Sequence, residues 1–146
     1  MDRTPAPPPR RPWSLYIFIA WAMLQAFNTG LVLWDLTGPL AQFGSPSTPF
    51  GWLSLALAFV APFGFAASVY GLWGLHPWGR YLFLVLSTLF FGANLAGAWL
   101  PGGLPWATPN ARLLATARYG LALAIPLVYF NLAWIKTLFR YKEESL

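Results

Sequence analysis

Residues 81–100 read YLFLVLSTLFFGANLAGAWL, a run without an acidic or basic side chain. A helix needs roughly 20 apolar residues to cross a hydrocarbon core about 30 Å thick, and this run has that length. Strands of a membrane barrel would alternate apolar and polar residues, and this run does not alternate. The sequence therefore predicts a membrane-spanning helix over 81–100.

Three further runs have the same character, and together they predict an all-α fold, an integral membrane four-helix bundle. The bundle occupies residues 13–140, between a Pro- and Arg-rich tail, 1–12, and a short tail, 141–146. The four predicted spans are about 13–36, 50–73, 81–100 and 113–135.

The composition of the chain excludes several classes of protein. Of 146 residues only 9% are charged, whereas a soluble domain carries about 25%, and 58% are hydrophobic. The net charge of +5 comes from basic residues at the ends of apolar runs, so we expect the lipid bilayer as partner and no nucleic acid.

The side chains that carry out catalysis are scarce. The chain has no cysteine and a single histidine, His76. It shows no carboxylate pair, no nucleophile with a base and no cluster of metal ligands. We therefore expect no enzyme activity, no catalytic residue, no metal and no cofactor.

Basic residues also predict how the bundle lies in the membrane, because Lys and Arg are enriched on the cytoplasmic side. Arg112 and Arg118 fall on one side, and the other side carries seven of the nine basic residues. We therefore expect a multi-pass inner-membrane protein with both termini in the cytoplasm. The seven are Arg3, Arg10, Arg11, Arg80, Lys136, Arg140 and Lys142.

The two halves of the chain resemble each other. Segments 12–75 and 77–140 share matched positions at offsets of 60 to 65 residues. We expect two tandem, parallel helical hairpins related by an axis along the membrane normal, as in parallel transporter repeats. Chance similarity within a chain rich in Leu, Ala and Phe is the alternative. The clearest matches are Pro12-Trp13 with Pro77-Trp78, Thr48-Pro49 with Thr108-Pro109, and Pro62 with Pro126.

Charge inside the predicted spans is limited to their outer ends. Asp35 ends the first span, and Arg118 lies about a turn and a half into the fourth. A charge at that depth is less costly when it is paired, so we expect an Asp35–Arg118 ion pair, with Arg112 as the alternative partner. Such a pair is a structural clamp or, alternatively, part of a polar outer vestibule.

Neutral polar residues form a second set within the spans. They either bond across helices, which we favour, or line a polar pocket for a quinone or a lipid head group. The candidate pocket residues are Gln25, Asn28, Thr29, Asn94 and Asn131.

Small residues recur at four-residue spacing in the last two spans. Such faces let helices approach closely, within the bundle or against another subunit. The set comprises Gly92, Ala93, Ala96, Gly97, Thr116, Gly120 and Ala124.

The inner turn Pro77-Trp78-Gly79-Arg80 resembles the Pro-Trp-Gly/Ala-Arg turn of small, uncharacterised four-helix bacterial inner-membrane proteins. The resemblance implies fold and location but no functional residue. Physically, Pro77 and Gly79 favour a turn, and we expect Trp78 and Arg80 to anchor it at the head groups. His76 is expected to be a turn residue and not a haem ligand.

Two functions fit these features. The first is an accessory or scaffold subunit of a larger membrane complex, which binds other membrane subunits or itself. The small size, the small-residue faces and the missing chemistry favour it. The alternative is a small binder or transporter of a hydrophobic ligand such as a lipid or a quinone.

The orientation can be tested with single cysteines, because the chain has none of its own. Cysteines at Ser45 and Ser145 should react with a membrane-impermeant maleimide from opposite sides of the membrane. Labelling of both positions from the same side would contradict the predicted topology.

Overall fold

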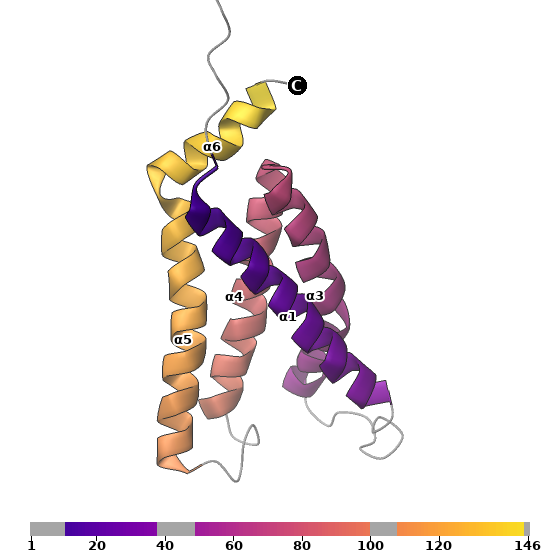
Figure 1. Ribbon diagram of the computed structural model, residues 1–146. Coiled ribbons are helices and arrows are strands. Elements are labelled where there is room, and N and C mark those ends of the chain that lie inside the picture. Colours follow the sequence, from indigo (N-terminus) through magenta and orange to yellow (C-terminus); the bar gives the residue numbers. More distant parts are fainter. Residues whose placement is uncertain (1–10, 38–48, 100–107, 145–146) are drawn as a thin grey trace, which may run out of the picture.

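The computed structural model describes residues 11–37, 49–99 and 108–144, and every element in these ranges is a helix (Figure 1). Four helices are long and apolar enough to cross a membrane, which confirms the predicted four-helix membrane fold. The elements are α1 (Trp13–Thr37), α3 (Pro49–Trp73), α4 (Pro77–Trp99), α5 (Pro109–Asn131) and α6 (Ala133–Glu144).

The helix termini differ from the expected ones where local backbone geometry decides them. α5 begins at Pro109, because the Thr108 hydroxyl caps it by accepting a hydrogen bond from the Ala111 N–H at 3.3 Å. It ends at Asn131, because Leu132 is extended, with ψ near 137°. The fourth span therefore lies about four residues earlier than expected at both ends.

The short helix α6 replaces the expected end of the fourth span. It is amphipathic: Ile135, Leu138 and Phe139 are buried, whereas Trp134 and Lys136 are exposed. A helix with one apolar and one polar face suits the membrane surface better than the hydrocarbon core. Figure 1 shows α6 turning away from the axis of α5.

The four long helices form two hairpins that run in the same direction. α1 and α4 begin at one end of the bundle, and α3 and α5 return to it (Figure 1). α1 packs on α3, α3 on α4, and α4 on α5. We call this end, where α1 and α4 begin, the closed end, and the opposite end the splayed end, because there α1 diverges from α5.

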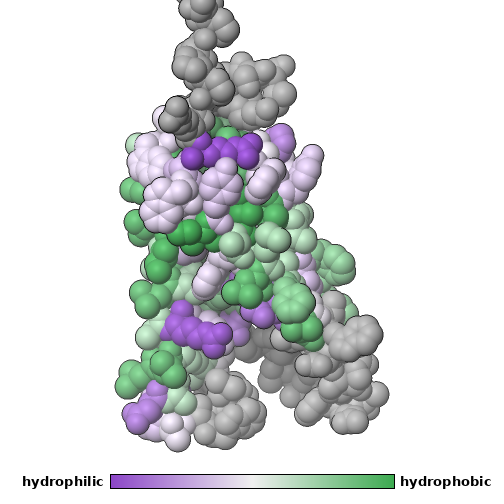
Figure 2. Space-filling view, in the orientation of Figure 1, coloured by the Kyte–Doolittle hydropathy of each residue, from purple (hydrophilic) through white to green (hydrophobic). Residues whose placement is uncertain are grey.

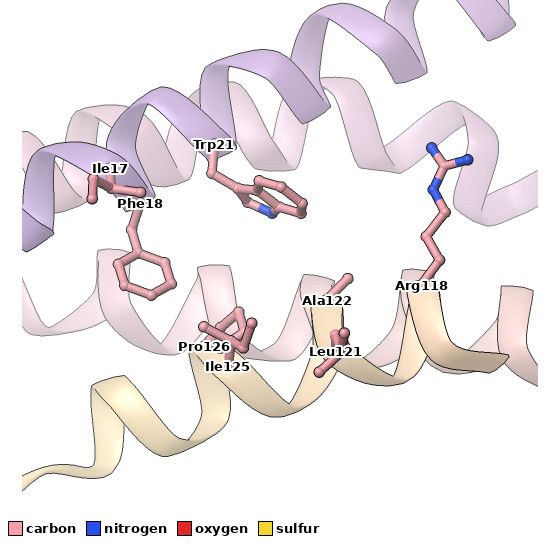
Figure 3. Close-up of a pocket in the computed structure, with 8 residues that line it drawn as sticks. All are labelled: Ile17, Phe18, Trp21, Arg118, Leu121, Ala122, Ile125 and Pro126. Carbon is pink, nitrogen blue, oxygen red and sulfur yellow. The ribbon is translucent and has the colours of Figure 1, made fainter. Parts of the chain in front are cut away.

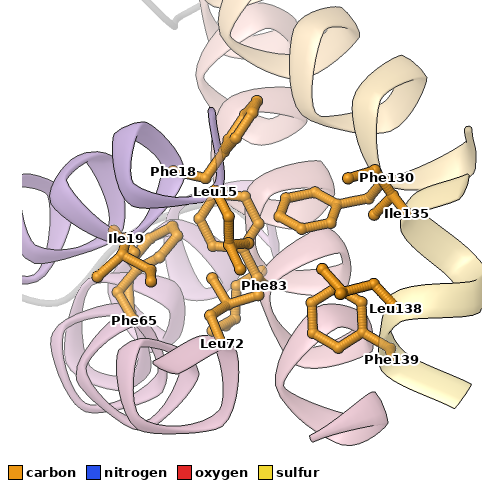
Figure 4. Close-up of a cluster of buried hydrophobic side chains, with 13 residues drawn as sticks. Leu15, Phe18, Ile19, Phe65, Leu72, Phe83, Phe130, Ile135, Leu138 and Phe139 are labelled. Carbon is orange, nitrogen blue, oxygen red and sulfur yellow. The ribbon is translucent and has the colours of Figure 1, made fainter. Parts of the chain in front are cut away.

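A cluster of buried apolar side chains holds the closed end together (Figure 4). Rings from three helices meet at its centre: Phe18 lies 6.3 Å from Phe83 and 5.0 Å from Phe130, and the last two are 5.5 Å apart. Such edge-to-face and tilted aromatic pairs stabilise the core in addition to the burial of apolar surface. The cluster comprises Leu15, Phe18, Ile19, Ala22, Ala61, Phe65, Leu72, Phe83, Leu86, Phe130, Ile135, Leu138 and Phe139.

The turn between α3 and α4 contains a tight helix contact at Gly71 and Gly79. The His76 N–H bonds the Gly71 carbonyl at 2.8 Å, and Leu75, at a φ of 57°, takes the left-handed position that usually belongs to glycine. A Cβ on Gly79 would lie 2.5 Å from the Gly71 Cα and 2.7 Å from the Leu72 nitrogen, so only glycine fits there.

We expected Trp78 and Arg80 to anchor this turn at the head groups, and the structure agrees with this for Trp78 but not for Arg80. Trp78 is exposed, in keeping with a residue at the head groups, and His76 stacks on it with the rings 6.1 Å apart. Arg80, however, is only 8% exposed, and its guanidinium lies 4.5 Å from the Tyr81 ring and 6.0 Å from that of Phe139. α6 therefore covers Arg80, which does not reach outward.

The described tryptophans at the helix ends are exposed at both ends of the bundle. Trp73 and Trp134 lie at the closed end, and Trp52 and Trp99 at the splayed end. Tryptophan favours the membrane–water interface, and Figure 2 shows predominantly apolar colour over the middle of the bundle. The protein is thus a multi-pass membrane protein, while the orientation of its termini stays a prediction.

The internal repeat also stays a prediction. The two hairpins have the same order and direction, and Pro62 and Pro126 are both buried inside their helices. The halves differ after these prolines, because α3 continues to Trp73 whereas α5 breaks at Leu132.

The glycine contact gives a matched pair of variants. Gly79→Ala should destabilise the protein by about 1–3 kcal/mol, because its Cβ meets backbone that cannot move aside. Gly92→Ala places a Cβ in open space, so it should leave stability unchanged or raise it by up to about 1 kcal/mol. Apparent Tm in detergent measures both, and equal Tm values would show that the α3–α4 contact is not tight.

Candidate functional site

α1 and α5 are joined at the closed end and separate beyond it. The Ser14 and Tyr129 hydroxyls share a hydrogen bond of 2.8 Å, and the ring of Phe18 stacks on that of Tyr129 at 4.3 Å. From these contacts α1 crosses away from α5 (Figure 1). A cleft therefore forms between the two helices, with α4 contributing to its wall toward the splayed end.

The part of the cleft nearer the closed end is an apolar hollow of about 290 Å³ (Figure 3). In Figure 3 the Trp21 ring points from α1 toward α5, and the Arg118 side chain reaches from α5 toward α1. Arg118 is the charged member of a lining that is otherwise apolar. The lining residues are Ile17, Phe18, Trp21, Arg118, Leu121, Ala122, Ile125 and Pro126.

The part nearer the splayed end is a polar hollow of about 510 Å³. It shares Trp21, Arg118 and Ala122 with the apolar hollow, so the two adjoin, and we call them together the α1–α5 cleft. Its lining comes from three helices: Trp21, Gln25, Asn28, Thr29 and Leu31 from α1, Phe90, Phe91 and Asn94 from α4, and Arg118, Tyr119 and Ala122 from α5.

The structure brings four of the five predicted pocket residues to this polar hollow. Gln25, Asn28 and Thr29 lie on one face of α1, and Asn94 faces them from α4. Asn131 does not belong to the set. It is exposed at the closed end, where its side-chain amide donates to the Leu127 carbonyl at 2.8 Å.

Two of these polar groups, on Thr29 and Asn94, bond within their own helices and not across helices. The Thr29 hydroxyl donates to the Gln25 carbonyl at 2.6 Å, and the Asn94 amide donates to the Phe90 carbonyl at 2.7 Å. The bond that does join two spans at the splayed end runs from the Trp99 indole to the Thr116 hydroxyl, at 2.8 Å.

Arg118 lies farther from the start of its helix than the sequence suggested. Because α5 begins at Pro109, Arg118 follows nine residues later, about 14 Å along a helix of 23 residues. A charged side chain within a candidate membrane span is costly and is usually kept for a function. Its Cζ lies 5.8 Å from the centre of the Tyr119 ring.

Trp21 is the site residue that sequence reasoning missed. Its indole nitrogen is buried and has no hydrogen-bond partner among the described residues. A buried donor without a partner is rare in proteins and calls for an explanation. The available signal was its position, because Trp21 is the one tryptophan far from the ends of a predicted span.

The predicted ion pair cannot be placed, since the side chain of Asp35 lies outside those that the structure describes. Arg112, the alternative partner, is partly buried and does not line either hollow. Among the described residues no group of three His, Cys, Asp or Glu side chains gathers in a metal-binding arrangement.

Only some of the predicted small residues lie at contacts between helices of this chain. Thr116 joins α4 and α5 as described, and Ala93, Ala96 and Gly97 are half-buried. A Cβ on Gly92 or Gly120 would meet nothing within 4 Å, and Ala124 is exposed. A Cβ added at Gly92 is therefore not expected to disturb packing inside this chain.

Comparison with known proteins yields one partial similarity. No protein family matches the chain, and no solved structure matches it. A stretch of 83 residues, 54% of the chain, is 37% identical to glycine betaine transporter 1 of Vibrio parahaemolyticus serotype O3:K6. The chain covers only 16% of that transporter's length, so the similarity is to a segment of a larger membrane transporter.

Proposed function

We propose that this protein is a small membrane-embedded binder or transporter that holds an amphiphilic ligand in the α1–α5 cleft. The observation that carries the proposal is that two hollows adjoin at Trp21, Arg118 and Ala122, one lined almost wholly by apolar side chains and the other by a mixture that includes polar ones. A molecule with a polar head and an alkyl chain matches this arrangement, with its head among the polar side chains and its chain in the apolar hollow. Both hollows are close to or within the size range of ligand pockets, about 300–1,000 Å³.

The place of the cleft supports a ligand that comes from the bilayer. It lies between two membrane-spanning helices, where its apolar hollow accepts a chain between Ile17 and Ile125. An alkyl chain gains little there from the hydrophobic effect, since lipid tails are equally apolar. Shape and the contacts of the polar head therefore decide the affinity.

The partial similarity to a transporter supports this class of function over a purely structural one. Glycine betaine itself is a second candidate ligand. Its carboxylate suits Arg118, and its trimethylammonium group suits the rings of Trp21 and Tyr119. It carries no alkyl chain, however, and would leave the apolar hollow empty, so we favour the amphiphile.

The proposal predicts selective labelling by a photoreactive probe. Protein in phosphatidylcholine nanodiscs is irradiated with dodecanol that carries a diazirine on its chain, and adducts are mapped by mass spectrometry. We expect adducts on 17–31 and 118–126 in the parent protein. Ala122→Phe fills the junction of both hollows and should remove most of them.

Ala124→Phe is the matched control, because Ala124 is exposed on the same helix and does not line the cleft. It should label as the parent does. Adducts spread evenly over the lipid-facing helices, or labelling unchanged in Ala122→Phe, would show that the cleft holds no ligand.

An accessory or scaffold subunit remains the second candidate function. Gly92 favours it, because it leaves open space on the surface of α4 where another helix could approach closely. If a partner complex exists, Gly92→Leu should release the subunit from it while His76→Ala stays assembled. Gentle extraction and native sizing measure this, and migration of the parent protein as a lone bundle would contradict the scaffold function.

A further inference from the structure

We infer that the head group of the ligand is anionic, a phosphate or carboxylate on a lipid taken from the bilayer, and that Arg118 binds it. This inference rests on the proposed function and adds the chemical class of the ligand. It starts from the charges of the polar hollow. The lining residues described there include one arginine and neither aspartate nor glutamate, so the charged group in contact with a ligand is positive.

The guanidinium of Arg118 is suited to such a head group. It presents five N–H donors in a plane and pairs with carboxylate or phosphate through two of them. An ion pair with Asp35 would occupy two donors and leave three. Binding of an anion at this site therefore does not require Arg118 to lack a carboxylate partner.

A second donor belongs to a residue that lines the same space. The indole N–H of Trp21 is buried without a partner among the described residues, and Trp21 lines both hollows. Figure 3 shows its ring between α1 and α5, on the side of the cleft opposite the backbone of Arg118. The nitrogen itself is covered by neighbouring atoms, so an acceptor oxygen in the cleft would reach this donor only after a shift of the ring, and an anionic head group supplies several such oxygens.

The aromatic rings of the cleft raise the alternative of a cationic head group, but an anionic head group is still favoured. A trimethylammonium group would bind on ring faces, and Tyr119 is the ring of α5 that lines the polar hollow. The Arg118 guanidinium already lies 5.8 Å from the centre of that ring. A cationic head group there would meet a like charge, whereas an anionic one meets an opposite charge.

Competition against the neutral diazirine probe tests the inference. Dodecyl phosphate, dodecanol, dodecyltrimethylammonium and glycine betaine are compared as competitors, the three amphiphiles at equal concentrations in the bilayer. Dodecyl phosphate should compete about 10- to 100-fold better than dodecanol, the range expected for charge-assisted hydrogen bonds. Arg118→Gln should reduce this preference to about twofold or less while cleft labelling by the neutral probe persists.

Arg112→Gln removes the same charge from the same helix outside the cleft and should keep the preference. Equal competition by dodecanol and dodecyl phosphate, or a preference that survives Arg118→Gln, would overturn the anionic head group and leave the amphiphile site standing. If glycine betaine competed effectively and the three amphiphiles did not, the lipid head group would be overturned and the ligand would be a small solute. Absence of cleft labelling by the probe itself would instead refute the proposed function.

Discussion

The attachment of α1 to α5 at one end only is the constraint on which the rest of the structure depends. The stacked rings of Phe18 and Tyr129, with the Ser14–Tyr129 hydrogen bond, fix the two helices at the closed end. The cluster of buried apolar side chains at the closed end also packs this end of the bundle against α4 and α6. Since α1 packs otherwise on α3, it crosses away from α5. The cleft is the direct result of this crossing.

Much of the fold could be predicted from the sequence, because the thickness of the bilayer fixes the length of an apolar helix. The four spans were predicted from this length, and the tryptophans at their ends were predicted from the preference of tryptophan for the membrane–water interface. Helix termini followed less well, because they depend on local backbone geometry. Thr108 and Pro109 form a recognisable start, but the extended conformation of Leu132 leaves no trace in hydropathy. The helix α6 was therefore merged with the span before it.

The residues of the polar pocket could also be predicted only in part, because some are placed by the local helix and others by the packing of helices against one another. Gln25, Asn28 and Thr29 share a helix, so helical periodicity alone places them together. Asn94 joins them through the packing of α4, and Asn131 fails to join because it lies at the closed end. The distance of Arg118 from the start of its helix was underestimated because it depends on where α5 begins. No pattern in the sequence could show that the Trp21 donor lacks a partner, since that depends on every neighbouring side chain.

The splay of α1 and the charge of Arg118 are linked physically. If α1 packed on α5 along its whole length, the guanidinium would be enclosed by Trp21, Phe18 and neighbouring apolar side chains, and burying an unsolvated charge is very costly. The divergence of the helices leaves a polar hollow into which the side chain extends, next to the polar face of α1. A bundle of this size gains little by keeping such a space at the expense of packing. Under the function proposed above, a ligand that needs both explains the hollow and the charge together.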